Sequence, residues 1–254
     1  IRELDTNLTS LSFNPDGTKI VSVHSNQSLR QPSEVKVWDF KSGQLLNKTQ
    51  GGVPNKIQDL AFNANNKNIL IAEGDNGIIR DSRTGLILQT LNRKVTTVAF
   101  SPDARTLVTG NQDGTMQTWD AITYSPQNTL SGHTGSIRRI TFSRDGRLLM
   151  SISQDGTARV WDAKSWRPLQ IISGNSFALS PDGSIVAVAR EGIYFLEAES
   201  GTPLRKFSDN RTKALAFLYN SQIILADGIA YDVATGSTLY RTFSISPEDV
   251  IFSL

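Results

Sequence analysis

Two stretches of this sequence repeat each other closely. Asp113-Gly-Thr-Met-Gln-Thr-Trp119-Asp120 and Asp155-Gly-Thr-Ala-Arg-Val-Trp161-Asp162 share the spacing from aspartate to tryptophan, and their tryptophans lie 42 positions apart. A third stretch, Glu34-Val-Lys-Val-Trp38-Asp39, keeps the end of the pattern. A period of this length is typical of repeat folds, in which each unit buries its apolar faces against its neighbours.

Weaker copies extend the pattern to six units. The tryptophan position is occupied in turn by Trp38, Arg80, Trp119, Trp161, Leu196 and Tyr231, and the next residue is always acidic. Upstream of each lies an apolar residue, in turn Phe13, Phe62, Phe100, Phe142, Leu179 and Phe217. Most of these precede a turn such as Ser180-Pro-Asp-Gly183, whose proline and glycine suit a type I turn.

Each unit therefore predicts four short strands divided by tight turns. In the fourth unit we expect strands at residues 137–142, 147–151, 158–162 and 169–172. Short strands at even spacing indicate an all-β fold built from four-stranded antiparallel sheets. Apolar runs such as 69–72 and 185–188 indicate that the second strand of each unit is covered on both faces.

These motifs resemble those of the WD-repeat family, and the resemblance covers nearly the whole chain. It is most specific at residues 95–130 and 136–172, fair at 8–49 and degenerate elsewhere. It implies a β-propeller in which the first strands of the units surround a central channel. The regular Ser-Pro-Asp-Gly turns and the absence of cysteine suggest a bacterial-type member, and the propeller domain of a larger protein.

The resemblance also implies a single propeller domain over residues 1–254, with seven blades favoured. The complete blades are expected at residues 8–49, 57–91, 95–130, 136–172, 176–207 and 212–243. The closing blade would take its strand d from residues 1–5 and its strand a from residues 246–254, with its middle strands missing. The alternative is a six-bladed ring with two spare strands.

Well-formed repeats of this family carry a buried polar tetrad. The fourth unit matches it with His133, Ser151, Asp155 and Trp161, and Ser153 is a second candidate for the hydroxyl. The third unit offers Thr109, Asp113 and Trp119 but lacks the histidine. Such groups satisfy one another inside the fold. Arg80 and Leu196 cannot replace an indole donor, so we expect packing alone to hold their blades.

A polar column near the start of each first strand is the predicted binding site, on the rim of the top face. It consists of Thr9, Gln58, Thr96, Arg138, Asn175, Lys213 and Glu248. Basic residues at 92–94, 138–139 and 211–213 would suit an acidic peptide or a phosphate, and a merely solvated rim is the alternative. Trp166 is expected on the opposite face, as a contact anchor or as a cover for its own blade.

No catalytic or metal-binding pattern is present in the sequence. The chain has no cysteine and only two histidines, and it lacks zinc spacing, a calcium loop and a glycine-rich phosphate loop. We therefore expect no cofactor, no metal and no enzymatic activity. A net charge of +2 argues against nucleic acid, and no apolar run is long enough for a membrane helix. The lack of cysteine fits a reducing compartment, and we expect a cytoplasmic location.

The favoured function is a non-catalytic scaffold or sensor domain that binds a protein or peptide partner of unknown identity. Such a module is expected to be fused to, or assembled with, other domains. The first alternative is a propeller hydrolase with carboxylates at the channel mouth, for which Asp59, Glu248 and Asp249 are the candidates. The second alternative is a glycan-binding propeller.

Overall fold

A computed structural model describes most of the chain, namely residues 8–14, 17–24, 32–54, 57–63, 68–73, 76–91, 94–207, 212–218 and 221–241. Within these ranges the chain forms strands and turns only, and six four-stranded antiparallel sheets result. The predicted all-β fold is thereby confirmed. The described residues contain no helix that is long and apolar enough to cross a membrane.

In every sheet the four strands neighbour one another in chain order, and we call them strands a to d. The chain divides into two compact units, with the boundary after Ile140. The first unit holds three sheets. The first sheet contains β1 (Leu8–Phe13), β2 (Lys19–His24), β3 (Pro32–Asp39) and β4 (Leu45–Pro54). The second contains β5 (Ile57–Phe62), β6 (Asn68–Glu73), β7 (Asn76–Asp81) and β8 (Ile87–Leu91). The third contains β9 (Val95–Phe100), β10 (Thr106–Asn111), β11 (Met116–Asp120) and β12 (Pro126–Leu130).

The boundary between the units falls inside β13 (Ile137–Phe142), which begins the fourth sheet. That sheet continues with β14 (Leu148–Ser153), β15 (Thr157–Asp162) and β16 (Pro168–Ser173). The fifth sheet contains β17 (Ser176–Leu179), β18 (Ile185–Ala189), β19 (Ile193–Glu197) and β20 (Pro203–Phe207). The sixth contains β21 (Leu215–Phe217), β22 (Ile223–Ala226), β23 (Ile229–Asp232) and β24 (Thr238–Arg241). The first strand predicted for the fourth unit, residues 137–142, coincides with β13, and the other three differ from the observed bounds by one or two residues at their ends.

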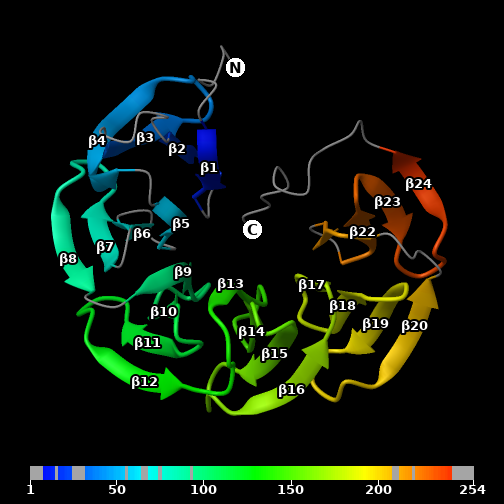
Figure 1. Ribbon diagram of the computed structural model, residues 1–254. Helices are drawn as coiled ribbons and strands as arrows, with labels where there is room; N and C mark the ends of the chain where they lie inside the picture. The colour runs from blue at the N-terminus through cyan, green and yellow to red at the C-terminus, as the bar shows by residue number, and fades with distance from the viewer. Residues whose placement is uncertain are drawn as a thin grey trace. The chain divides into compact units, whose positions relative to one another are not determined.

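Burial falls from strand b to strand d in each sheet. Leu70, Ile71 and Ala72 of β6 are fully buried, as are Val186 and Ala187 of β18. This confirms that strands b are covered on both faces. Strands d are mostly exposed, and in β8 and β12 four of five residues face solvent. Figure 1 shows this order in the first unit, where strands a lie at one edge of the three sheets and strands d at the other.

Facing sheets share their apolar cores within each unit. In the first unit, Val21 and Val37 of the first sheet pack in one cluster with Leu60 and Ile71 of the second. In the second unit, buried side chains of β14 and β15 form a cluster with those of β17, β18 and β19. Because an isolated four-stranded sheet cannot cover both its faces, this stacking supplies most of the burial.

The predicted closing blade lies outside the described residues, because it was assigned to residues 1–5 and 246–254. The numbers of blades and domains therefore stay predictions.

Candidate binding surface

Each sheet has two ends with different chemistry. At the c–d end, strand c turns into strand d and strand a turns into strand b. At the b–c end, strand b turns into strand c and the chain enters strand a. The predicted rim residues belong to the b–c end. Gln58, Thr96 and Arg138 are the second residues of β5, β9 and β13, and Asn175 and Lys213 stand just before β17 and β21.

At the c–d end, one acidic residue closes the turn in every sheet. It stands at the end of strand c and accepts a hydrogen bond from the hydroxyl of the Ser or Thr three positions later. The six pairs are Asp39–Ser42, Asp81–Thr84, Asp120–Thr123, Asp162–Ser165, Glu197–Ser200 and Asp232–Thr235. In the five aspartate pairs, hydrogen bonds from this Ser or Thr hold the aspartate pKa below its usual value.

The residue after that Ser or Thr always has a left-handed backbone. Four sheets use a glycine there, the residue type that adopts this conformation at least cost. The third and fourth sheets instead use Tyr124 and Trp166, each with φ of 58°. The Tyr124 hydroxyl is bonded to Asn68 in β6, which ties this turn to the second sheet. Trp166 is half-buried, and its role as a contact anchor or as a cover for its own blade stays a prediction.

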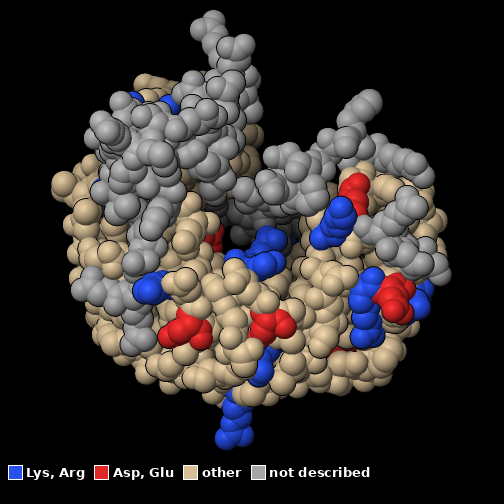
Figure 2. All heavy atoms as spheres, viewed as in Figure 1, with Lys and Arg blue, Asp and Glu red and all other residues tan. Residues whose placement is uncertain are grey.

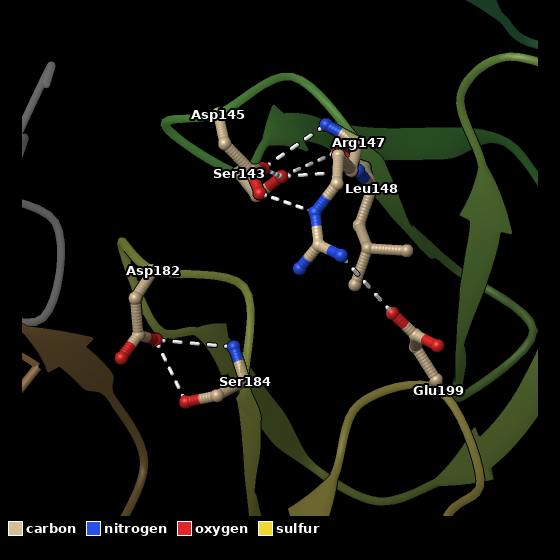
Figure 3. A network of polar contacts seen from close by, with 7 residues as sticks. All are labelled: Ser143, Asp145, Arg147, Leu148, Asp182, Ser184 and Glu199. Carbon is tan, nitrogen blue, oxygen red and sulfur yellow. Dashed lines mark hydrogen bonds and ion pairs between the residues drawn. The ribbon is translucent and has the colours of Figure 1, made fainter.

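The a–b turns at the same end are held by short-range polar contacts, shown for the second unit in Figure 3. Ser143 Oγ donates to Asp145 Oδ1 over 2.6 Å and accepts from the backbone N–H of Leu148 over 3.0 Å. Arg147 pairs with Asp145, and its Nη1 lies 3.9 Å from Glu199 Oε1. Ser143 and Asp145 thus hold the a–b turn, whereas the Arg147 and Glu199 side chains stay largely exposed.

Between the two ends, three sheets carry a hydrogen bond from an indole to a hydroxyl. Trp161 Nε1 donates to Ser151 Oγ over 3.0 Å, and Trp119 Nε1 donates to Thr109 Oγ1 over 3.1 Å. The hydroxyl in the fourth sheet is thus that of Ser151. Ser153 has another role, since its Oγ accepts the backbone N–H of Asp155. His133 is buried, and Asp155 and Asp113 each accept bonds from the threonine two positions later.

The first sheet contains a version of this network that sequence reasoning missed. Trp38 Nε1 donates to Ser22 Oγ over 2.7 Å, and Ser22 Oγ lies 2.8 Å from His24 Nε2. Both Ser22 and His24 belong to strand b, and both are buried. The sequence did contain a signal for it, because Ser22 occupies the strand b position that corresponds to Thr109 and Ser151 in the third and fourth sheets. The histidine was overlooked because it follows that serine by two residues instead of preceding strand a.

The prediction that packing alone holds the second sheet at Arg80 is wrong. Arg80 is buried at the tryptophan position, opposite Ile69 of β6. Its Nη1 donates to the carbonyl oxygen of Gly85 over 3.0 Å, so the guanidinium holds the c–d turn of its own sheet. A buried guanidinium requires such acceptors because leaving its donors unmet is costly.

At the b–c end of the first unit, the Thr96 hydroxyl is already engaged with backbone carbonyl groups. The hydroxyl oxygen of Thr96 lies 2.6 Å from the Ile137 carbonyl oxygen and 3.1 Å from that of Gly110. By contrast, Gln58 and Arg138 are exposed, as is Arg139. Strands β5 and β9 pack side by side, so this unit brings Gln58 and Thr96 to one edge. The side chain of Thr9 and the whole of Glu248 lie outside the described residues.

Asp59 joins two sheets at this same edge. Its Oδ2 accepts the Thr97 hydroxyl over 2.7 Å and the Val98 backbone N–H over 2.9 Å, and its Oδ1 accepts the N–H of Leu60. Burial raises the pKa of this carboxyl above its usual value, although these hydrogen bonds and the charge of Arg139 work in the opposite direction. Asp59, a candidate residue of the alternative hydrolase, thus connects β5 with β9.

In the second unit, the b–c end holds its candidates by their backbones. The Asn175 N–H donates to the Ala189 carbonyl oxygen over 2.8 Å. The Lys213 N–H donates to Asp227 Oδ2 over 2.9 Å, and the Ala214 N–H donates to Asp227 Oδ1 over 2.8 Å. Both Asn175 and Lys213 keep their side chains exposed. Strands β17 and β21 pack together, so this unit brings these two positions to one edge.

Charge is dispersed on the face drawn in Figure 2. Acidic side chains lie beside basic ones, and most of the visible described surface carries neither. This fits the net charge of +2 and offers no broad patch of one sign.

Comparison with known proteins finds WD repeats in two consecutive segments of the chain. The model described as "WD domain, G-beta repeat" matches residues 85–120 and 124–162, each match running from strand d of one sheet to strand c of the next. An uncharacterized WD repeat-containing protein of Synechocystis sp. is 29% identical over 133 residues, which cover 50% of this chain and 36% of that protein. The COMPASS component SWD3 of Saccharomyces cerevisiae is 29% identical over 126 residues, which cover 44% of this chain and 38% of that protein. The matches therefore span less than two fifths of either relative.

Proposed function

Because this chain is a member of the WD-repeat family, we propose that it is a non-catalytic scaffold or sensor domain that binds a protein or peptide through the b–c ends of its sheets. The observation that carries the proposal is that some polar groups at this end hold the structure together while their neighbours are exposed to solvent. Asp59, Thr96 and Asp227 are engaged in holding strands and loops, whereas Gln58, Arg138, Asn175 and Lys213 present exposed side chains beside them.

Such a surface suits recognition because its exposed side chains stand on a fixed backbone. A rigid scaffold lowers the entropy lost when a partner orders the contact. Loops and strand ends on a rigid framework are also where binding residues concentrate. Asp59, the described residue of the alternative hydrolase set, accepts three hydrogen bonds from its surroundings, which favours a positioning role over a catalytic one.

We further propose that the module works inside a larger assembly in the cytoplasm. One relative is named as a component of a complex, and the matched segments are only part of both relatives. A binding arm of this kind would position its partner for another domain or subunit.

The proposal is tested by partner capture with single variants. Arg138→Gln and Lys213→Gln each remove one exposed charge from the b–c end, one in each unit. Lys164→Gln and Arg167→Gln are matched controls, because both are exposed in the c–d turn of the fourth sheet. Proteins captured from extracts of the source organism are identified by mass spectrometry, purified and titrated against each variant.

We expect at least one b–c variant to weaken the purified partner's affinity about fivefold or more, with the controls unchanged. A partner that binds all four variants equally would overturn the proposed surface. A partner lost only with the control variants would move the surface to the c–d end.

A further inference from the structure

Two basic side chains in the fifth sheet share one aromatic ring. The Arg190 guanidinium carbon lies 4.1 Å from the centre of the Tyr194 ring, and the Lys206 Nζ lies 4.8 Å from it. A cation this close to an aromatic face is held by the negative charge density of the ring. The two charges are consequently less than about 9 Å apart, and both groups are exposed.

Local structure brings these three residues together at the b–c end. Arg190 follows the last residue of β18, and Tyr194 is the second residue of β19. Tyr194 pairs with Val188 on one side and with Lys206 of β20 on the other, so Tyr194 and Lys206 lie on the same face of the sheet. The turn is tight, and the Arg190 N–H donates to the Gly192 carbonyl oxygen over 3.0 Å.

Gly192 leaves room for the lysine to lie over this turn. Its φ is +135°, and a β-carbon built on it would stand 3.1 Å from Lys206 Cε and 2.7 Å from the Phe207 carbonyl oxygen. Any side chain here would therefore displace Lys206 and strain the backbone. The glycine thus provides the space that the lysine occupies over this turn.

These two charges lack the ion pairs that occupy other basic residues. Lys48 pairs with Glu34, and Arg147 pairs with Asp145. Among the described residues, no carboxylate lies within ion-pair distance of Arg190 or Lys206. Two like charges held near one ring without a counter-ion favour the binding of an anion beside them.

We propose that the Arg190–Tyr194–Lys206 cluster binds the phosphate group of a phosphorylated side chain in a peptide partner. This rests on the proposed function, since it names a chemistry for one part of the b–c end. A phosphate monoester carries nearly two negative charges and three acceptor oxygens, which matches two neighbouring cations. Nucleic acid requires a track of several phosphate contacts, and the near-neutral chain with its dispersed charge does not supply one. An anionic membrane likewise requires a wider basic surface.

The test is a titration of the isotope-labelled chain, followed by NMR, with a blocked Gly-phosphoserine-Gly tripeptide. The comparison probes are the unphosphorylated tripeptide, Gly-Glu-Gly, inorganic phosphate, and vesicles containing phosphatidylserine. The variants are Arg190→Gln/Lys206→Gln and a matched control of equal charge loss, Lys164→Gln/Arg205→Gln. Arg205 is the immediate neighbour of Lys206 in β20, and Lys164 lies at the c–d end of the fourth sheet.

We expect the phosphorylated tripeptide to shift the backbone amide signals of residues 190–194 and 206, and the control variant to bind like the wild type. Arg190→Gln/Lys206→Gln should lose about tenfold or more in affinity, because two charge-assisted contacts are removed. Binding should weaken below about pH 6, where the phosphate monoester takes up its second proton. Tyr194→Phe should bind normally, and Tyr194→Leu should lose affinity because the ring no longer holds the two cations.

Five results would overturn the inference. These are the absence of any amide shift at millimolar tripeptide, equal affinity of both double variants, equal affinity for Gly-Glu-Gly, stronger binding to vesicles than to the tripeptide, and equal affinity for free phosphate. If a captured protein partner still depends on Arg138 or Lys213 in any of these cases, only the phosphate site fails and the proposed function stands. If free phosphate binds as tightly as the tripeptide, the site recognises the anion without its peptide, which also contradicts the proposal.

Discussion

The two ends of the sheets are built in different ways, although they belong to the same strands. The c–d end repeats one solution six times, an acidic residue that accepts a hydroxyl three positions later and then a left-handed residue. The b–c end varies more from sheet to sheet. The third and fourth sheets share one turn there, in which Asp113 or Asp155 accepts a hydroxyl from the threonine two positions later, and the others differ. It has His24 at the end of strand b in the first sheet, Asp59 between the second and third sheets, Arg190 with Lys206 in the fifth sheet and Asp227 in the sixth.

The difference lies in the sequence separation of the partners. The c–d turns are closed by residues three positions apart, so each sheet can keep its turn whatever happens elsewhere. At the b–c end some contacts are local, and others are long-range, such as Thr97 with Asp59 and Lys213 with Asp227. A repeat protein can therefore hold its architecture with one end and vary the other for binding. Four predictions test this view.

The largest effect is expected midway between the ends, at Trp161. Trp161→Leu should lower the free energy of unfolding by about 3 kcal/mol, because it leaves a cavity and removes the donor to Ser151. Chemical denaturation followed by circular dichroism measures the change. The double variant Ser151→Val/Trp161→Leu introduces the residues that the fifth sheet has at the corresponding positions, Val188 and Leu196. It should cost about 1 kcal/mol less than the sum of the single variants, since the two residues are coupled. If the losses in free energy of unfolding were additive, a valine and leucine at these positions would not be a stable replacement for the hydrogen-bonded serine and tryptophan.

The second effect concerns Arg80, which replaces the indole in the second sheet. Arg80→Lys should cost about 2 kcal/mol, because a compact ammonium cannot reproduce the guanidinium contact with the Gly85 carbonyl oxygen and stays buried. Arg80→Leu should cost less, since it removes the buried charge along with the bond. The same denaturation measurement compares the two. A larger loss for leucine than for lysine would mean that packing, not the hydrogen bond, makes Arg80 suitable here.

Much of this organisation could be predicted from the sequence, and the parts that were missed share a cause. The strands and the tryptophan series follow from local patterns, so they were found. The acidic residue with a Ser or Thr three positions later is an equally local pattern. It could have been predicted from the sequence in the same way as the tryptophan series. The Arg190–Tyr194–Lys206 cluster required the pairing of β19 with β20, and a register shift between Phe195 and Leu196 makes that pairing impossible to obtain by counting residues. Long-range contacts such as that of Asp59 with Thr97 require two sheets to be placed, which no local pattern provides.

A third prediction separates the two aromatic residues that take the left-handed position. Trp166→Gly should raise the free energy of unfolding by about 0.5–1 kcal/mol, because glycine adopts this conformation without a steric cost. Tyr124→Gly should lower it, since Tyr124 also bonds Asn68 and packs against the core of the first unit. Thermal unfolding of both variants checks the difference in sign. If Trp166→Gly also weakened partner binding, the strained backbone at Trp166 would be explained by a binding role of this side chain at the c–d end.

The smallest effect distinguishes the ends by the sign of their pH dependence. Because hydrogen bonds from Ser165 lower the pKa of Asp162, its ionised form stabilises the fold above the usual aspartate value of 3.8. This contribution is lost as the pH falls through the lowered folded-state pKa. Asp162→Asn keeps an acceptor without titrating, so the stability of the wild type minus that of the variant should rise with pH below 3.8 and then level off. Asp120→Asn should give the same profile if the c–d ends are equivalent.

Asp59 should give the opposite slope, because burial raises the pKa of its carboxyl. Its contribution is fully present below 3.8 and is lost as the pH rises through the folded-state pKa, so the wild type minus Asp59→Asn difference should fall with pH above 3.8. Any constant cost of fitting the amide between Thr97 and Leu60 shifts the whole curve and leaves its slope unchanged. Denaturant midpoints measured from pH 3 to pH 8 therefore test the comparison directly. Profiles of the same sign at Asp59 and Asp162 would mean that both carboxylates are held as turn caps, and that the two ends are not electrostatically distinct.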